Sequence, residues 1–323
     1  MTESDFIARL RGLATDPAAR GLMDDAAVLG IGDTQIVLTH DMLVEGVHYL
    51  PDDPAETVAW KLVAVNASDL SAKGAAPLGV LLGFSLAGDS DWDREFVRGL
   101  EAALSHFGVP LLGGDTVAMP SGAPRTLGMT AIGTAPSSGA PSRAGARPGD
   151  LLFAVGPIGD AGLGLALLRG ELEAEGEVRA SLVDAYRRPM PDPALGAALA
   201  PLATAMADIS DGLLIDASRI AAASGCAVEV DLSAVPLSAA FVAVRGDQRE
   251  SRLFAATAGD DYRLILALDP ARVRDARALA DRLGRPIWPI GACTAGEGVS
   301  LSFNGEAMPL PASLGYEHGS RSG

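Results

Sequence analysis

The sequence is poor in positive charge, and above all in lysine. Among its 323 residues, 25 are basic and 41 acidic, which gives a net charge of −16, and the only lysines are Lys61 and Lys73. A chain this acidic repels nucleic acid and anionic membranes over most of its surface. We therefore expect neither as a partner. No GxxxxGK[ST] string occurs, which excludes a P-loop nucleotide site.

Cysteine and long apolar runs are also scarce. Cys226 and Cys293 are the only cysteines, too few for a zinc cluster and more simply interpreted as small buried apolar residues. No apolar run reaches the roughly 18 residues that span a bilayer. The N-terminus MTESDFIARL also lacks the apolar stretch of a signal peptide. We therefore expect a soluble, cytoplasmic protein.

Apolar residues, by contrast, are plentiful enough for a large core. Hydrophobic residues make up 48% and charged residues 20% of the chain, and its length suits two domains of ordinary size. Strand and helix patterns are mixed in both halves, which predicts an α/β or α+β class. The stretch 135–148, rich in Ala, Pro, Ser and Gly, suits a linker or a long functional loop. We place the boundary there, between domains of residues 1–137 and 138–323.

Local patterns predict the limits of three elements. Residues 54–73 form a helix with Asp53 as its N-cap. Residues 109–112 form a strand that ends in the Gly-Gly-Asp-Thr sequence of residues 113–116. Residues 193–206 form a helix, with a short strand after it at 207–209.

The placement of the aspartates points to chemistry. Most of them stand at the ends of predicted strands or at the starts of helices, and Asp69 lies in an otherwise apolar helix. A single Asp before Gly is usually a turn or a cap, but an unpaired carboxylate at Asp69 would be costly. Pooled carboxylates with few basic residues hold hard divalent ions such as Mg²⁺ together with substrate phosphates. The positions are Asp24, Asp25, Asp41, Asp69, Asp115, Asp208, Asp211, Asp260 and Asp261.

Two further features leave alternatives open. The glycine-rich residues 156–164 follow a strand and open a helix, which suits either a phosphate at the helix N-terminus or tight helix–sheet packing. His48 follows Gly46 and Val47, and as a lone histidine it is either a ligand contact or a buried structural residue.

Five motifs occur in a fixed order along the chain. They are Asp41-x-x-Val44-x-Gly46-x-His48, Ala64-Val65-Asn66-Ala67-Ser68-Asp69, Gly113-Gly114-Asp115-Thr116, Asp208-Ile209-Ser210-Asp211-Gly212-Leu213 and Gly259-Asp260-Asp261-Tyr262. Together they resemble the thiamine-monophosphate kinases, of the superfamily that includes aminoimidazole ribonucleotide synthetase. The resemblance runs from about Asp24 to Tyr316, nearly the whole chain.

The resemblance implies a fold and a reaction. The N-terminal domain would form a homodimer in which strands of both subunits build a β-barrel, and the C-terminal domain would be an α/β sandwich. ATP would phosphorylate thiamine monophosphate to thiamine diphosphate by direct in-line transfer, with several Mg²⁺ ions between the two anions. Because the acceptor is an ionised phosphate oxygen, no residue is needed as a dedicated catalytic base.

The resemblance also assigns residues by matching position. The metal ligands would be Asp25, Thr39, His40, Asp41, Asp69, Asp115, Asp208 and Asp211; the ATP contacts Gly114, Arg143 and Ser210; and the thiamine monophosphate contacts His48, Asp260 and Tyr316. The chain departs from the family pattern at two of these positions. His40 stands where a small hydroxyl residue is usual, and Asp260 stands where Glu is usual.

Other functions compete with this one. Within the superfamily, selenophosphate synthetase needs a reactive Cys or selenocysteine near its N-terminus, and the first cysteine here is Cys226. The hydrogenase maturation carbamoyl dehydratase needs a C-terminal Cys, which this sequence lacks. Aminoimidazole ribonucleotide synthetase resembles the chain less over residues 208–213. A non-catalytic metal- or nucleotide-binding protein is the alternative from another class.

Overall fold

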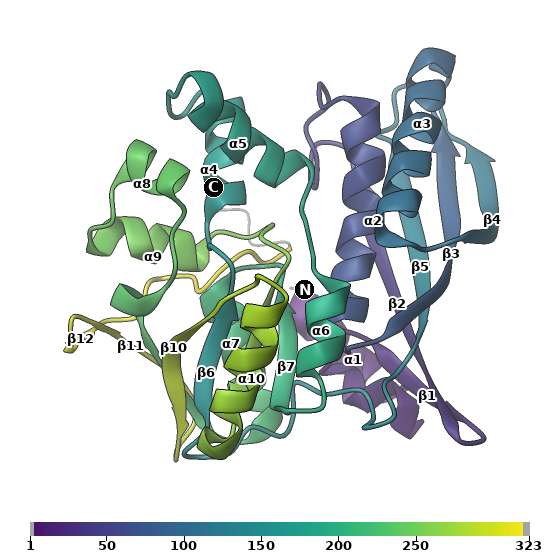
Figure 1. The fold of residues 1–323 in the computed structure, drawn as a ribbon. Helices are drawn as coiled ribbons and strands as arrows, with labels where there is room; N and C mark the ends of the chain where they lie inside the picture. Colours follow the sequence, from purple (N-terminus) through teal and green to yellow (C-terminus); the bar gives the residue numbers. More distant parts are fainter. Residues whose placement is uncertain (1–2, 319–323) are drawn as a thin grey trace.

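The structure, a computed structural model, describes residues 3–318, which form two α/β halves packed side by side (Figure 1). The elements of the N-terminal half are α1 (Glu3–Leu10), the 3-10 turn η1 (Pro17–Leu22), β1 (Ala27–Ile31), β2 (Thr34–Val44), α2 (Ala55–Ala72), β3 (Ala76–Leu86), α3 (Ser90–Phe107), β4 (Leu111–Ala118) and β5 (Thr126–Thr134). Within residues 3–318, no helix has both the length and the apolar character needed to cross a membrane.

The elements of the C-terminal half alternate more irregularly between strand and helix. They are β6 (Leu151–Val155), α4 (Asp160–Leu168), α5 (Gly176–Arg187), α6 (Pro193–Leu199), β7 (Ala203–Ile209), α7 (Leu213–Ser224), β8 (Ala227–Asp231), η2 (Leu232–Ala234), α8 (Ala239–Arg245), α9 (Arg249–Thr257), β9 (Arg263–Leu268), η3 (Pro270–Arg272), α10 (Val273–Arg282), β10 (Ile287–Thr294), β11 (Gly298–Phe303) and β12 (Glu306–Met308). The mixed α/β class with two parts is as predicted.

The N-terminal sheet has five strands in the order β1-β2-β5-β3-β4. Only the β3–β4 pair is parallel. Alternate residues of β2 and β5, such as Val37, Leu43 and Met129, are buried in a core shared with α2 and α3. The sheet is open in this single chain, over the residues that the structure describes. The barrel shared with a partner therefore stays a prediction.

Helix α2 is buried on all sides, because it packs against both halves. It contacts β2, β5 and α3 on one side and α6 and β7 on the other, and nearly every residue in it is buried. The contact with α6 is so close that a Cβ on Gly196 would lie 2.2 Å from the Ser71 carbonyl oxygen, so only glycine fits there. From Val58 onward, a polar side chain on α2 therefore sits inside the protein and needs a partner.

The C-terminal sheet has seven strands in the order β12-β11-β8-β10-β6-β9-β7. Helix α7 covers one face, with Leu213 and Ile220 in that core, and α6 and α10 cover the other, with Leu199 and Ala276. This is the predicted sandwich of a sheet between helices. The edge strand β7 lies against α2, and it brings Asp208 to the junction of the two halves.

Three local predictions were wrong in detail. The strand from residue 109 continues through the Gly-Gly-Asp-Thr sequence, so β4 ends at Ala118. The helix expected over 193–206 ends at Leu199, and β7 begins at Ala203, because a short apolar run does not by itself distinguish a buried strand from a helix. Helix α2 begins without a side-chain cap, and Asp53 instead pairs with Arg187 at 2.6 Å.

Candidate metal and substrate site

An acidic cleft of about 630 Å³ opens where the two halves meet. Its walls include the turn before β1, strand β2, helix α2, the loop before β6, and the end of β7 with the turn after it. Most of the predicted metal and ATP residues line this cleft. They are Asp25, Thr39, His40, Asp41, Asp69, Arg143, Asp208, Ser210 and Asp211.

Three carboxylates converge at the base of the cleft. One oxygen each from Asp25, Asp69 and Asp208 lies within 4.8 Å of the others, a spacing that suits a metal ion. Neighbouring hydroxyls orient two of them: Thr39 donates to Asp69, and Ser68 donates to Asp208 at 2.7 Å. The carboxylates come from three elements far apart in the sequence, so the fold has brought them together despite their repulsion.

Two buried cations offset part of this charge. The Lys73 ammonium, with a side chain 0% exposed, contacts Asp24 and lies 2.6 Å from an Asp25 oxygen. The Arg143 guanidinium pairs with the other Asp25 oxygen. Ser224 at the end of α7 donates to the Arg143 carbonyl oxygen at 2.9 Å, which fixes the loop that carries this arginine.

The pKa values of the carboxyl groups in the cleft show that they have too few neighbouring cations to balance their charge. Burial, and then repulsion from Asp211 and Asp25, raises the pKa of Asp41 to about 6. Burial and the neighbouring carboxylates raise the pKa of Asp69 and that of Asp208 well above their usual range. Burial acts the same way on Asp24, but Lys73 and the hydrogen bonds from Ser142 and Arg20 together outweigh it and lower the pKa of Asp24 to about 2.

The turn after β7 is held by a residue that none of the sequence motifs singles out. The fully buried Asp216 accepts hydrogen bonds from the backbone N–H groups of Ser210 and Asp211 at 3.1 and 3.2 Å. Arg219 bridges Asp216 and Asp211, at 2.6 Å from each. This network sets the direction in which Asp208, Ser210 and Asp211 face the cleft.

The predicted thiamine monophosphate residues form a second cluster beside the cleft. The Tyr316 N–H donates to the Asp211 carbonyl oxygen at 2.9 Å, which ties the two clusters together. The Tyr316 and His318 rings are 4.9 Å apart, and the His318 and His48 rings are 5.1 Å apart. Asp260 joins through its N–H, which donates to the Ser210 carbonyl oxygen at 2.7 Å. Burial, and then His318, lowers the pKa of His48, which favours the neutral form of its ring.

Gly114 and Asp115 are the two predicted residues that lie elsewhere. Both are exposed on the edge strand β4, outside the cleft. Across the sheet, Asp41 is in register with Met129 on β5, Leu82 on β3 and Gly114 on β4. Three strand spacings separate Asp41 from Gly114, roughly 14 Å. This chain therefore does not bring Asp115 to its own acidic cluster.

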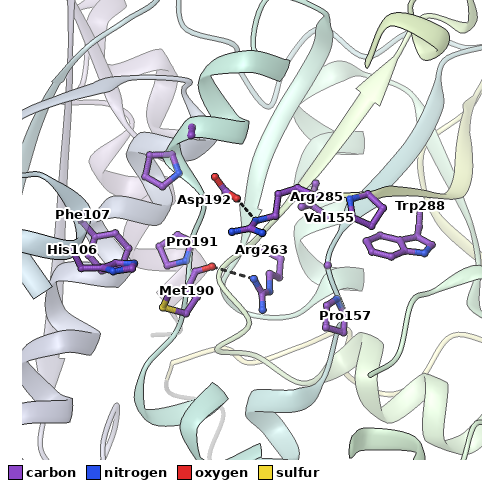
Figure 2. Close-up of a pocket in the computed structure, with 14 residues that line it drawn as sticks. His106, Phe107, Val155, Pro157, Met190, Pro191, Asp192, Arg263, Arg285 and Trp288 are labelled. Carbon is purple, nitrogen blue, oxygen red and sulfur yellow. Dashed lines mark hydrogen bonds and ion pairs between the residues drawn. The ribbon is translucent and has the colours of Figure 1, made fainter. Parts of the chain in front are cut away.

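A second cleft, of about 590 Å³, lies between the end of α3 and the C-terminal half (Figure 2). Its charged groups already have partners: Arg285 pairs with Asp192 at 2.7 Å, and Arg263 donates to the Met190 carbonyl oxygen at 3.0 Å (Figure 2). Asp192 is the only carboxylate among the described residues that line it. It therefore offers no set of metal ligands.

The glycine-rich residues 156–164 serve packing. A Cβ on Gly164 would lie 2.0 Å from the Leu182 carbonyl oxygen, so α4 approaches α5 closely. Both carboxylate oxygens of the buried Asp261 accept from the Gly159 N–H, at 3.0 and 2.9 Å. The segment is absent from the described lining of the acidic cleft, which favours the packing alternative over a phosphate site.

Both lysines also escaped prediction as site residues. Lys61 lies in the apolar helix α2 and Lys73 is the residue that caps its C-terminal end, and they are 2% and 0% exposed. The reasoning applied to Asp69, that a charged group in an apolar helix needs a partner, holds equally for a lysine. Their rarity in the sequence was the available signal.

Replacing Lys73 with methionine is expected to destabilise the protein by about 3–5 kcal/mol, because Asp24 and Asp25 would lose their buried cation. Urea unfolding monitored by circular dichroism measures this. The matched control is Arg94→Ala, which removes an exposed ion pair to Asp91 and should cost about 0–1 kcal/mol. A Lys73→Met protein as stable as the control would show that the ammonium contributes little.

Comparison with known proteins places these features in a family. Residues 23–135 match the AIR synthase related protein N-terminal domain, and residues 147–304 match the C-terminal domain of the same family. The thiamine-monophosphate kinase of Caulobacter vibrioides is 42% identical over 98% of this chain and 91% of its own length.

Two solved structures are similar over almost their whole length. AaThiL complexed with AMPPCP and TMP has a TM-score of 0.85 at 26% identity, covering 98% of this chain and 97% of that one. The thiamine-monophosphate kinase from Stenotrophomonas maltophilia K279a has a TM-score of 0.78 at 34% identity, covering 94% of this chain and 96% of that one.

Proposed function

The chain belongs to the AIR synthase related proteins and, among them, to the thiamine-monophosphate kinases, and we propose that the acidic cleft is where it transfers a phosphoryl group from ATP to thiamine monophosphate. The product is thiamine diphosphate, so the enzyme acts in thiamine diphosphate biosynthesis. The observation that carries the proposal is the convergence of Asp25, Asp69 and Asp208 within 4.8 Å, next to predicted ATP contacts on the same cleft.

Magnesium fits the donor set of this cleft. Hard carboxylate oxygens predominate, and the raised pKa values of Asp41, Asp69 and Asp208 indicate a site that lacks cations. Bound there, Mg²⁺ would neutralise the charge between two phosphate groups. We propose as its ligands within one chain Asp25, Thr39, His40, Asp41, Asp69, Asp208 and Asp211. At His40 the backbone carbonyl is the better candidate, because the ring is hydrogen-bonded to Thr130 at 2.9 Å.

The residues of the chain contribute orientation and charge, not proton transfer. Arg143 stands in the cleft as a fixed guanidinium, and with Ser210 it would contact the ATP phosphates. The acceptor phosphate is ionised at neutral pH, so in-line transfer needs alignment and cancellation of like charge rather than a base. His48, Asp260 and Tyr316 would hold the thiamine end in the adjoining cluster.

We also propose that the enzyme is a homodimer built on the N-terminal sheet. Strand β4 is an exposed edge eight residues long, and edges of that kind invite pairing with another chain. Apolar side chains are exposed on this strand and on other strands of the same sheet, including Met42, Leu81, Leu112 and Val117. The shared barrel expected from the family would cover this surface, within an N-terminal domain that we place at residues 1–137.

Substrate choice tests the proposed function. With ATP and Mg²⁺, a coupled ADP assay should show rapid turnover of thiamine monophosphate. Free thiamine should give a kcat/KM lower by on the order of 10²-fold or more, because a site built for a phosphate rejects an acceptor that lacks it. Aminoimidazole precursors serve as the control for the related synthetase activity. Comparable rates with thiamine and its monophosphate, or turnover of the aminoimidazole precursor alone, would contradict the assignment.

A further inference from the structure

Lys61 is a buried cation whose neighbours all belong to the thiamine end of the site or adjoin it. Its side chain is 2% exposed, and it rises from the middle of α2. The ammonium lies 3.1 Å from Oδ1 of Asp260 and donates to the His48 carbonyl oxygen at 3.0 Å. It also sits 4.0 Å above the centre of the Tyr186 ring. One ammonium thus joins three segments that are well separated in the sequence.

The loop that carries Asp260 needs such an anchor. Asp260 and Tyr262 have φ angles of +68° and +49°, a left-handed conformation that is uncommon for aspartate and costly for tyrosine. The Tyr262 hydroxyl donates to Asp260 Oδ1 at 3.2 Å, the same oxygen that Lys61 contacts. Two donors on Oδ1 fix the carboxylate and leave Oδ2 available for a donor on a substrate.

The His48 segment is fixed from the same point. Lys61 holds the His48 carbonyl oxygen, and the Tyr186 hydroxyl approaches that oxygen at 3.4 Å. The His48 ring accepts the Val44 N–H on Nδ1 at 3.0 Å, so the other ring nitrogen, Nε2, carries the proton of the neutral ring. The backbone contact and the ring contact together set the direction in which this N–H points.

We propose that Lys61 is the positioning residue of the thiamine end: it holds Asp260 and His48 in the geometry that recognises thiamine monophosphate, without touching the nucleotide. This inference rests on the proposed function. The Lys61 contact also explains how Asp can replace the usual Glu at position 260. Aspartate is one methylene shorter than the usual glutamate, and the Lys61 and Tyr262 contacts hold the short carboxylate at a fixed place, which a mobile side chain of that length would not keep.

The test is a separation of the two Michaelis constants in Lys61→Met, which keeps the side-chain volume and removes the ammonium. We expect the KM for thiamine monophosphate to rise about 10- to 100-fold, the range for a lost contact to a charged group. The KM for ATP should stay within about twofold, since Lys61 acts only on the thiamine end. The control is Arg98→Ala, whose exposed pair with Glu56 lies outside both clusters, and both constants should be unchanged.

A double-mutant cycle with Asp260→Ala shows whether Lys61 acts through Asp260. In the Asp260→Ala protein, adding Lys61→Met should raise the KM for thiamine monophosphate by a clearly smaller factor than it does in wild type, because only the His48 contact remains to be lost. A further rise as large as in wild type, or equal rises in both Michaelis constants of the single variant, would overturn the proposal and leave Lys61 a structural residue.

A pair of uncharged polar substitutions keeps the proposal testable if Lys61→Met does not fold. Lys61→Gln with Asp260→Asn retains polar groups at both positions, and its KM for thiamine monophosphate should match that of Asp260→Asn within about threefold. A tenfold difference between them would count against the proposal. Wild-type turnover of thiamine monophosphate is measured first, so failure of the proposed function and failure of this inference give different results.

Discussion

Asp69→Asn is expected to remove nearly all activity and, at the same time, to raise the melting temperature of the metal-free protein. The activity falls by on the order of 10²-fold or more, because an amide replaces a carboxylate in a preorganised electrostatic site. The stability rises because Asp69 is buried, its pKa is well above the usual range, and Asp41, Asp208 and Asp25 contribute to that shift. Asparagine keeps an acceptor for the Thr39 hydroxyl.

Thermal melts in EDTA and in excess Mg²⁺, with a kcat measurement, test both parts. Wild-type protein should gain stability on adding Mg²⁺, since a ligand that binds the folded state stabilises it, and Asp69→Asn should gain much less. Asp91→Asn is the control, because the Asp91 side chain is 85% exposed. An Asp69→Asn protein with near-normal activity, or one that melts below wild type in EDTA, would show that Asp69 is a structural acid.

The pH dependence of the same melts is set by the direction of each pKa shift. The pKa of Asp41 is raised to about 6 and those of Asp69 and Asp208 are raised as well. The folded metal-free protein therefore keeps protons that the unfolded chain has already released. Stability from these groups is fully present below their unfolded pKa values and is lost as pH rises from about 4 through 6 and beyond. Asp69→Asn should weaken that loss.

Asp24 acts in the opposite direction. Its pKa falls from the ordinary value of 3.8 to about 2, so its contribution is present above about pH 4 and is lost as pH falls toward 2. Together the two effects predict that the metal-free protein is most stable in a window near pH 4, well below neutrality. Magnesium should move that maximum upward, because it binds the ionised carboxylates.

The acidic cluster could be anticipated from the sequence because a carboxylate within an apolar segment stands out. Asp69 stands in a run of apolar residues, and the need for a partner arises from the cost of burying a carboxylate. The residue pattern alone could not identify the partners, and only the family resemblance grouped Asp69 with Asp25 and Asp208. Ser68 and Asp208 are 140 positions apart, and only the packing of α2 against β7 brings them within 2.7 Å.

The burial of the lysines could not be predicted from the sequence either. Lys73 has a basic side chain in an apolar helix, but a lysine at a helix end is commonly a solvated residue. Its burial depends on α6 and β7 covering the second side of α2. Neither of these elements could be predicted as a neighbour, and the first residues of β7 were predicted as part of the helix that ends at Leu199, with only residues 207–209 predicted as a strand.

The largest gap between motif and structure is at Asp115. Its Gly-Gly-Asp-Thr motif is as specific as the others, yet its strand lies at the far edge of the sheet from β1 and β2. Sequence order says nothing about strand order, because neighbouring strands in a sheet need not be consecutive. The strand that carries Asp115 lies three strand spacings from Asp41, about 14 Å across the sheet, which suits a ligand that serves the other subunit of a dimer.

Mixing two inactive variants is therefore expected to restore activity. Asp115→Asn and Asp208→Asn should each be inactive alone. After denaturation and refolding of an equal mixture, half of the dimers should be mixed, and each should contain one intact site. That site combines the acidic cluster of one subunit with Asp115 of the other, so recovered activity should be about one quarter of wild type.

The matched control mixes Asp69→Asn with Asp208→Asn. Both residues belong to the same cluster in one chain, so every site in every dimer would carry a defect and no activity should return. Light scattering should show a species of about twice the chain mass of 32.9 kDa. If only a monomer is seen, or if the Asp115 and Asp208 variants fail to complement, Asp115 does not act across a subunit interface. Its place on the exposed edge of β4 would then be that of a strand residue, and the metal ligands would all come from the cleft of one chain.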